Sequence, residues 1–76
     1  MAKFYRIRVQ GHLDNQWREW LEWLEINHLT NGDTLLSGWL SDQAALHGVL
    51  DKLYELGLPL IGLEVADAPP APGLPA

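Results

Sequence analysis

INHLTNGDTLLSGWL, residues 26–40, decides the fold, because it reads as two strands joined at Asn31-Gly32. An Asn-Gly pair between β-rich runs is a strong hairpin signal, since both residues tolerate the positive φ that a tight turn requires. A helical pattern lies on either side of this hairpin, and one apolar strand pattern lies outside each helical pattern. The predicted order is therefore strand, helix, hairpin, helix, strand.

The length of the hairpin loop decides which side chains share a face of the sheet. A two-residue turn would put Ile26 on the same face as Leu35 and Trp39, whereas a three-residue loop ending in Gly32 would put it with Leu36, since a slip of one residue exchanges the two faces. We favour the three-residue loop, because it gathers Ile26 and Leu36 under the helices. This register leaves Leu35 and Trp39 on the opposite face.

The two outer strands are predicted from alternating apolar positions. Residues 4–10 and 60–66 each show the period of two that is typical of a half-buried strand. The residues on one side of these strands are Tyr5, Ile7, Val9, Ile61, Leu63 and Val65. Those on the other side are Phe4, Arg6, Arg8, Gln10, Leu60, Gly62 and Glu64.

The first helix is predicted from about Asn15, with Asp14 as its N-cap. Its buried stripe at positions i, i+3, i+4 and i+7 consists of Trp17, Trp20, Leu21 and Leu24. Three Trp within seven residues also fit a carbohydrate site or an aromatic cage. We favour the interpretation that Trp17 and Trp20 fill the core and that Trp23 covers its edge, since bulky aromatics close a small core.

The second helix is predicted to begin after Ser41 or Asp42 and to run to about Leu56. Its apolar stripe consists of Leu46, Val49, Leu50 and Leu53. Gly57 is suited to the left-handed residue that follows a helix, and Pro59 prevents any continuation. Gly38 of the hairpin lies on the face that the helices should cover, where it would admit a close helix.

The composition indicates one small domain over residues 1–66, followed by a Pro-rich tail over residues 67–76 that we expect to be flexible or polyproline-like. The chain has 76 residues and no cysteine, which excludes disulfides and thiolate chemistry. A core of this size supplies only about 3–5 kcal/mol, and oligomerisation is a common remedy.

Charge and hydropathy exclude several classes of partner. The net charge is −5 and the pI is about 4.8, so we expect no nucleic-acid binding, which depends on neutralising phosphates. No apolar run is long enough to span a membrane, and the N-terminal sequence lacks the apolar region of a secretory signal. We therefore expect a cytoplasmic protein.

The predicted order of elements resembles the ferredoxin-like βαββαβ fold of the α+β class. That resemblance implies a four-stranded antiparallel sheet whose first and third strands are central, with two helices on one face. The chain is similar in size and pattern to ACT-like regulatory modules. It also resembles short bacterial proteins with a DQAALHGVL stretch, here residues 42–50, that leads to an LGLPL segment, here residues 56–60. These relatives imply the fold and no activity.

The open face of this sheet is the main candidate site. Helices cover only one side, so a monomer would leave a set of apolar side chains in water, and such patches usually mark an interface. We expect a homo-oligomer, a dimer or larger, that associates through this face. The predicted interface residues are Phe4, Leu29, Leu35, Trp39 and Leu60.

Two other hypotheses remain open. As an ACT-like module, the protein would bind a small anionic ligand at the start of the first helix, where free amides favour an anion; the predicted site consists of Gly11, His12, Leu13 and Asp14. A small dimeric enzyme with His12 or His28 as its base is less favoured, because no nucleophile or orienting group can be named beside either.

No short spacing links His12, His28 and His47, so we expect no metal site and no cofactor.

Overall fold

The predicted hairpin is present, and its register is the one with the three-residue loop. In the computed structural model, which describes residues 2–66, β2 (Glu25–His28) pairs with β3 (Thr34–Leu40), and Ile26 lies opposite Leu36. The Leu29 amide donates to the Asp33 carbonyl oxygen at 2.8 Å, which closes the loop. Gly32 occupies the left-handed region with φ 93°.

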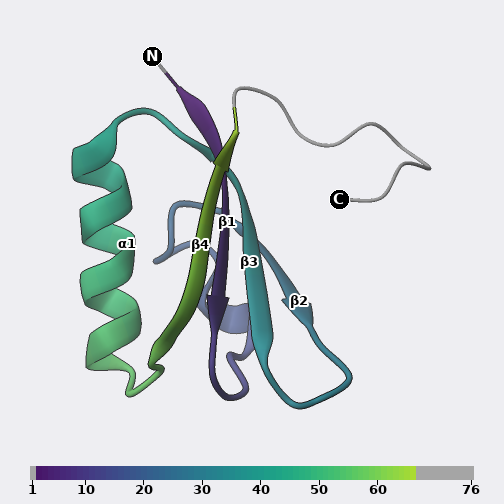
Figure 1. Cartoon of the computed structure of the whole chain (residues 1–76). Coiled ribbons are helices and arrows are strands. Elements are labelled where there is room, and N and C mark those ends of the chain that lie inside the picture. The colour runs from purple at the N-terminus through teal and green to yellow at the C-terminus, as the bar shows by residue number, and fades with distance from the viewer. Residues whose placement is uncertain (1, 67–76) are drawn as a thin grey trace.

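The sheet has four antiparallel strands in the order β2-β3-β1-β4, so the first and third strands are central, as predicted (Figure 1). The strand β1 (Lys3–Val9) pairs with β3 on one side and with β4 (Leu60–Ala66) on the other. The β1–β4 register shifts once, because Arg8 lies opposite Gly62 whereas Val9 lies opposite Leu60. Ile61 is thus an extra residue, as in a β-bulge.

The helix α1 (Gln43–Glu55) has both of the ends that the sequence indicates. The Asp42 carboxylate accepts a hydrogen bond from the Ala45 amide at 2.8 Å, so Asp42 is the N-cap. At the other end Gly57 has φ 76°. The Gly57 amide donates to the Tyr54 carbonyl oxygen, and the Leu58 amide donates to the Leu53 carbonyl oxygen. These two bonds form a Schellman motif, which satisfies carbonyls that the helix end leaves free.

The prediction of a first helix is wrong, so the described residues contain one α-helix and not two. A 3-10 helix over Asn15–Trp17 is followed by turns, in which the Leu24 amide donates to the Leu21 carbonyl oxygen. Glu22 and Trp23 both have φ 60°, a left-handed conformation that ends any right-handed helix. Leu21 and Leu24 are nevertheless buried, because tight turns bring them to the core as a helix would have done.

The short distance between β1 and β2 explains this difference. Val9, at the end of β1, lies opposite Thr34, whereas Glu25, at the start of β2, lies opposite Ser37. Three positions along a strand span only about 10 Å. A helix of eleven residues would be about 16 Å long. Compact turns cover the shorter path, although Gln, Arg, Glu and Leu make up most of the segment and are good helix formers, so the assembled sheet overrides the local helix propensity.

The core lies between the sheet and the layer formed by α1 and the turns before β2. Its buried apolar residues are Tyr5, Ile7, Val9, Leu13, Leu21, Leu24, Ile26, Leu36, Leu40, Leu46, Val49 and Leu53. Within residues 2–66 no helix has the length and apolar character needed to cross a bilayer. The predicted Pro-rich tail lies outside the described residues.

Candidate functional site

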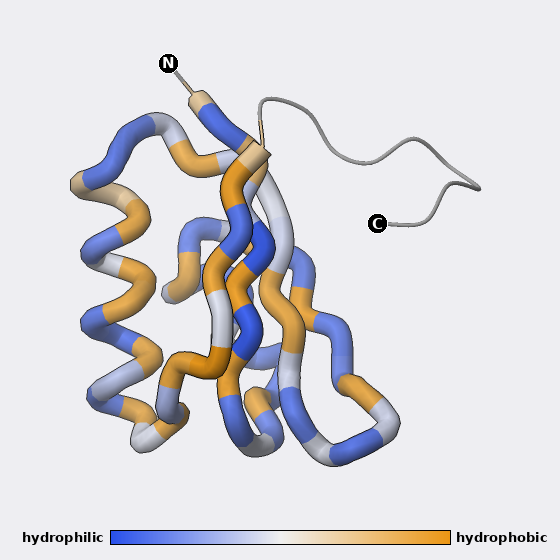
Figure 2. Tube along the Cα trace, viewed as in Figure 1, coloured by the Kyte–Doolittle hydropathy of each residue, from blue (hydrophilic) through white to orange (hydrophobic). Residues whose placement is uncertain are grey.

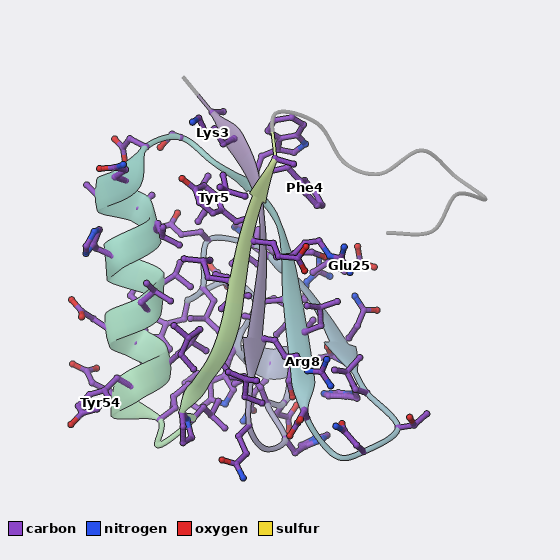
Figure 3. The ribbon with its side chains drawn as sticks, in the orientation of Figure 1. Lys3, Phe4, Tyr5, Arg8, Glu25 and Tyr54 are labelled. Atoms are coloured by element: carbon purple, nitrogen blue, oxygen red, sulfur yellow. The ribbon has the colours of Figure 1, made fainter. Side chains whose placement is uncertain are left out.

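The face of the sheet opposite α1 carries an alternating set of side chains from β1 and β3. Figure 3 shows Phe4 and Arg8 pointing away from α1, while Tyr5 points toward it. Because residues opposite one another share a face, the partners Trp39 and Leu35 lie on the same open side as Phe4 and Arg8. The open face therefore joins aromatic, basic and aliphatic side chains.

An aromatic pair occupies one end of the open face. Phe4 and Trp39 lie directly opposite each other on β1 and β3, with ring centroids 5.7 Å apart and ring planes at 74°. This edge-to-face arrangement is one that aromatic pairs prefer. The Trp39 side chain is still 49% exposed, so it has surface left to bury against a partner.

A shallow hollow of about 210 Å³ lies at the other end of the same face. Gly62 offers no side chain to fill it, and both of its basic neighbours, Arg6 and Arg8, belong to β1. The complete lining is Arg6, Arg8, Leu29, Leu35, Gly62, Leu63 and Glu64. The hollow thus offers two guanidinium groups and the Glu64 carboxylate beside apolar side chains, and its two cations against one anion suit a further carboxylate carried on an apolar surface.

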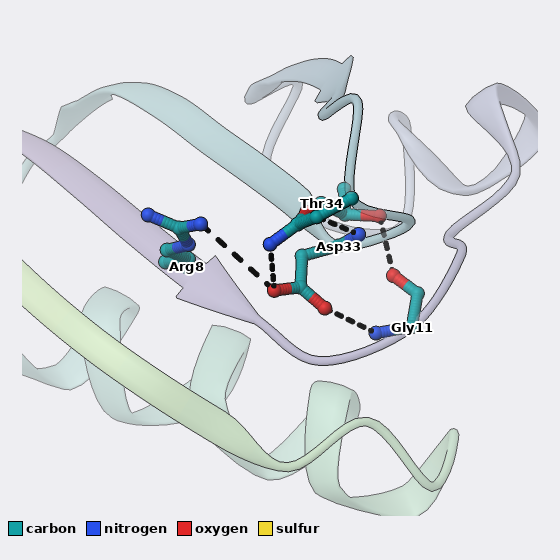
Figure 4. A network of polar contacts seen from close by, with 5 residues as sticks. Arg8, Gly11, Asp33 and Thr34 are labelled. Atoms are coloured by element: carbon teal, nitrogen blue, oxygen red, sulfur yellow. Dashed lines mark hydrogen bonds and ion pairs between the residues drawn. The ribbon is translucent and has the colours of Figure 1, made fainter.

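A polar network holds the hairpin against the loop after β1 (Figure 4). The Asp33 carboxylate accepts from the Gly11 amide at 3.4 Å and lies 3.9 Å from the Arg8 guanidinium. The Thr34 hydroxyl donates to the Gly11 carbonyl oxygen at 2.7 Å and accepts from the Leu13 amide at 3.1 Å. These bonds fix the end of the open face at which Arg8 lies.

The same network uses amides that the anion-binding hypothesis requires. The Gly11 and Leu13 amides donate to side chains of Asp33 and Thr34. Asp14 accepts from the Gln16 amide at 3.2 Å, so that donor is also engaged. These amides are therefore hydrogen-bonded within the chain at the predicted ligand site.

Two of the three histidines meet at this loop, which their spacing in the sequence does not indicate. The rings of His12 and His28 are stacked with centroids 4.1 Å apart, and the Nε2 atom of His28 donates to the Leu13 carbonyl oxygen at 2.6 Å. His47 lies on α1. No group of three or more potential metal ligands occurs among residues 2–66.

A second hollow, of about 550 Å³, lies beside the turns that replace the first helix. Its lining is Asn15, Gln16, Arg18, Glu19, Trp23, Glu25 and Ile26. Trp23 is 65% exposed and does not cover the edge of the core, which we had expected it to do. Trp20, which we had expected to fill the core, is also exposed. No histidine lines either hollow, so neither fits a site with a histidine base.

Four of the five predicted interface residues lie on the open face. Phe4 and Trp39 form the aromatic pair, and Leu29 and Leu35 line the first hollow. Leu60 lies opposite Val9, a core residue, because the extra residue Ile61 reverses the alternation of β4. The sequence gives no sign of the hollow above Gly62, because it depends on which long side chains of the neighbouring strand flank this glycine in the sheet.

A comparison with family models finds one described as a domain of unknown function, DUF8691, which matches residues 4–64. These residues include the aromatic pair, the hollow and all of the secondary structure except the ends of β1 and β4. Neither the curated proteins nor the solved structures contain a match to the chain.

Proposed function

The chain belongs to the DUF8691 family, and we propose that this member is a small interaction module that associates with a second copy of itself through the open sheet face. The observation that carries the proposal is that Trp39, although it meets Phe4 edge to face, is still half exposed. Large aromatic side chains at the centre of a contact supply most of the binding energy of many interfaces.

The character of the open face supports this proposal. Leu29 and Leu35 add aliphatic surface at the end of the face away from the aromatic pair. Arg8 lies opposite Leu35 at that end, and Arg6 lies between the two ends. Aromatic residues and arginine are enriched where proteins contact one another, so the composition of this face is that of an interface. The small core gives a reason for association, since burying these side chains adds to a modest folding free energy.

We also propose that the fold is a reduced form of the ferredoxin-like arrangement, in a protein of the cytoplasm. Two features support the ferredoxin-like arrangement: the strand order β2-β3-β1-β4 in the sheet, and the place of α1 after β3 and before β4 along the chain. In this interpretation the turns before β2 replace the first helix of that arrangement.

The mass in solution, measured by light scattering for the intact protein and for Trp39→Asp, tests the proposed self-association. We expect the intact protein to exceed the monomer mass at tens of micromolar, and Trp39→Asp to reduce the mass by half or more while the circular dichroism spectrum is retained. A carboxylate in place of the Trp39 indole would be desolvated in the contact without a partner, so the contact should dissociate.

Trp23→Asp is the matched control, because Trp23 is also exposed but lies outside the open face, beside the second hollow. We expect its mass to equal that of the intact protein. An intact protein that is a monomer throughout this range, or a folded Trp39→Asp that keeps the full mass, would contradict the proposal.

The ACT-like alternative, with a small anionic ligand, has weaker support. The amides of Gly11 and Leu13 are bound within the chain, so an anion at the predicted site would have to displace Asp33 and Thr34. Thermal unfolding in the presence of a panel of amino acids and nucleotides examines this alternative, since a ligand of the folded state raises the unfolding temperature.

A further inference from the structure

The outer edge of β4 differs from the other edge of the sheet. The strand β4 has seven residues and bonds only to β1, so a row of backbone donors and acceptors along it faces outward. Apart from Glu64, all of its residues are apolar or glycine. At the opposite edge β2 has four residues, of which Glu25, Asn27 and His28 are polar or charged. Only β2 is short and polar, as is typical of a protected edge.

The side of β4 that faces the helix layer is apolar and incompletely covered. Leu63 and Val65 lie opposite the buried residues Ile7 and Tyr5, yet they are 43% and 54% exposed. Leu60 and Ile61 are each 51% exposed. Figure 2 shows these hydrophobic positions along β4, interrupted by the hydrophilic Glu64. The helix α1 therefore covers the core but leaves the outer row of the sheet in water.

We propose that β4 pairs antiparallel with β4 of a second copy, with Leu63 at the two-fold axis, so that two sheets join into one continuous sheet of eight strands. This contact differs from the proposed contact through the open face, since it uses the edge of the sheet and the helix-facing side of β4, and on the open face it reaches only the hollow beside Gly62 and not Trp39.

The sequence of β4 is complementary to itself in this register. With Leu63 opposite its own copy, Val65 lies opposite Ile61 of the second copy, and these side chains form one apolar row. Glu64 then lies opposite Gly62 of the second copy and not opposite another carboxylate. Like charges directly opposite one another would destabilise such a pair, and this register avoids them.

The hollow on the open face gives the second copy's Glu64 a defined position. Gly62 lies between Arg8 and that carboxylate in one row across three strands, because Arg8 is opposite Gly62 in the sheet. Neighbouring strands are about 4.8 Å apart, so the long side chains of Arg8 and of Glu64 from the second copy can meet above the glycine. The hollow lined by Arg6, Arg8 and Gly62 is the space that this carboxylate would fill, beside the first copy's own Glu64, which also lines it. Arg8 would then lie between this carboxylate and that of Asp33, which is 3.9 Å from its guanidinium group.

Leu63→Lys tests the edge contact, and Leu63→Ile is its matched control. In the dimer the two introduced ammonium groups would oppose each other across the two-fold axis, whereas in a monomer the aliphatic stem of the new side chain would lie over Ile7 with its charge in water. Isoleucine preserves an apolar side chain with strand propensity. We expect Leu63→Lys to reduce the mass in solution by half and Leu63→Ile to leave it unchanged.

Combining the variants separates this proposal from the contact through the open face. If both contacts form, Trp39→Asp leaves the β4 dimer, Leu63→Lys leaves the open-face dimer, and the double variant is a monomer. A folded Leu63→Lys protein with the mass of the intact protein would overturn the edge contact alone. A folded Trp39→Asp protein with unchanged mass would overturn the open-face contact alone.

Hydrogen exchange of the intact protein provides a second test that does not depend on the folding of any variant. We expect the amides of β4 that point away from β1 to exchange slowly at tens of micromolar and faster on dilution, because only the second copy can bond them. Rapid exchange of these amides at every concentration, while those bonded to β1 remain protected, would overturn the proposal.

Discussion

Thr34 is the one buried residue among residues 2–66 that is polar, and its hydroxyl is used twice. It donates to the Gly11 carbonyl oxygen and accepts from the Leu13 amide. Thr34→Val keeps the shape of the side chain but leaves both backbone groups without their partner, so we expect the free energy of unfolding to fall by about 3 kcal/mol. Urea denaturation at one protein concentration measures this change. Thr30→Val, in the exposed loop, should alter it little; equal stability of the two variants would contradict the role given to Thr34.

Gly38 is a position at which the backbone of β3 lies close to the layer above it. A Cβ atom built at this residue would lie 2.9 Å from the Cδ2 atom of Leu24, whose side chain is itself buried. Gly38→Ala should therefore lower the free energy of unfolding by about 2 kcal/mol, since a packed core resists added volume and Gly38 has φ 156°, which L side chains rarely adopt. Gly62→Ala is the control, because nothing lies within 4 Å of its added Cβ. Thermal unfolding that ranks the two variants in the reverse order would contradict both the close contact with Leu24 and the strain at Gly38.

At the scale of the element, α1 depends on its cap. Asp42→Ala removes the bond from the Ala45 amide and should cost about 1 kcal/mol of stability, whereas Asp42→Asn should retain most of it. Asp51→Ala removes a carboxylate from an exposed position within the helix and serves as the control for lost charge. Chemical denaturation that gives the Asp42 and Asp51 alanine variants the same stability would exclude a capping role.

The elements that sequence could predict are those with a local signal at both ends. The hairpin register follows from Gly32, and α1 is bounded by Asp42 and Gly57, so no distant residue is needed. The segment before β2 has only the spacing of Leu21 and Leu24, which tight turns satisfy as well as a helix does. Its path depends on where β1 ends and β2 begins, and both are properties of the assembled sheet.

The same distinction applies to the candidate site. Alternation along β1 and β3 predicts that Phe4, Leu35 and Trp39 share a face, which is confirmed by their register. The position of Leu60 was predicted wrongly, because a bulge at Ile61 arises from the pairing of two strands and leaves no periodic mark. The meeting of the His12 and His28 rings likewise requires the loop after β1 to reach the hairpin.

At the scale of the whole molecule, the first and last strands are antiparallel neighbours, and Phe4 lies opposite Ala66. The polypeptide therefore enters and leaves the folded unit at one end of the sheet, with backbones about 5 Å apart. A unit with adjacent ends fits into a surface loop of another protein without forcing the host segments apart. The folded unit is thus suited to insertion as a domain into another protein, and that protein would then present the open face and the free edge of β4 together.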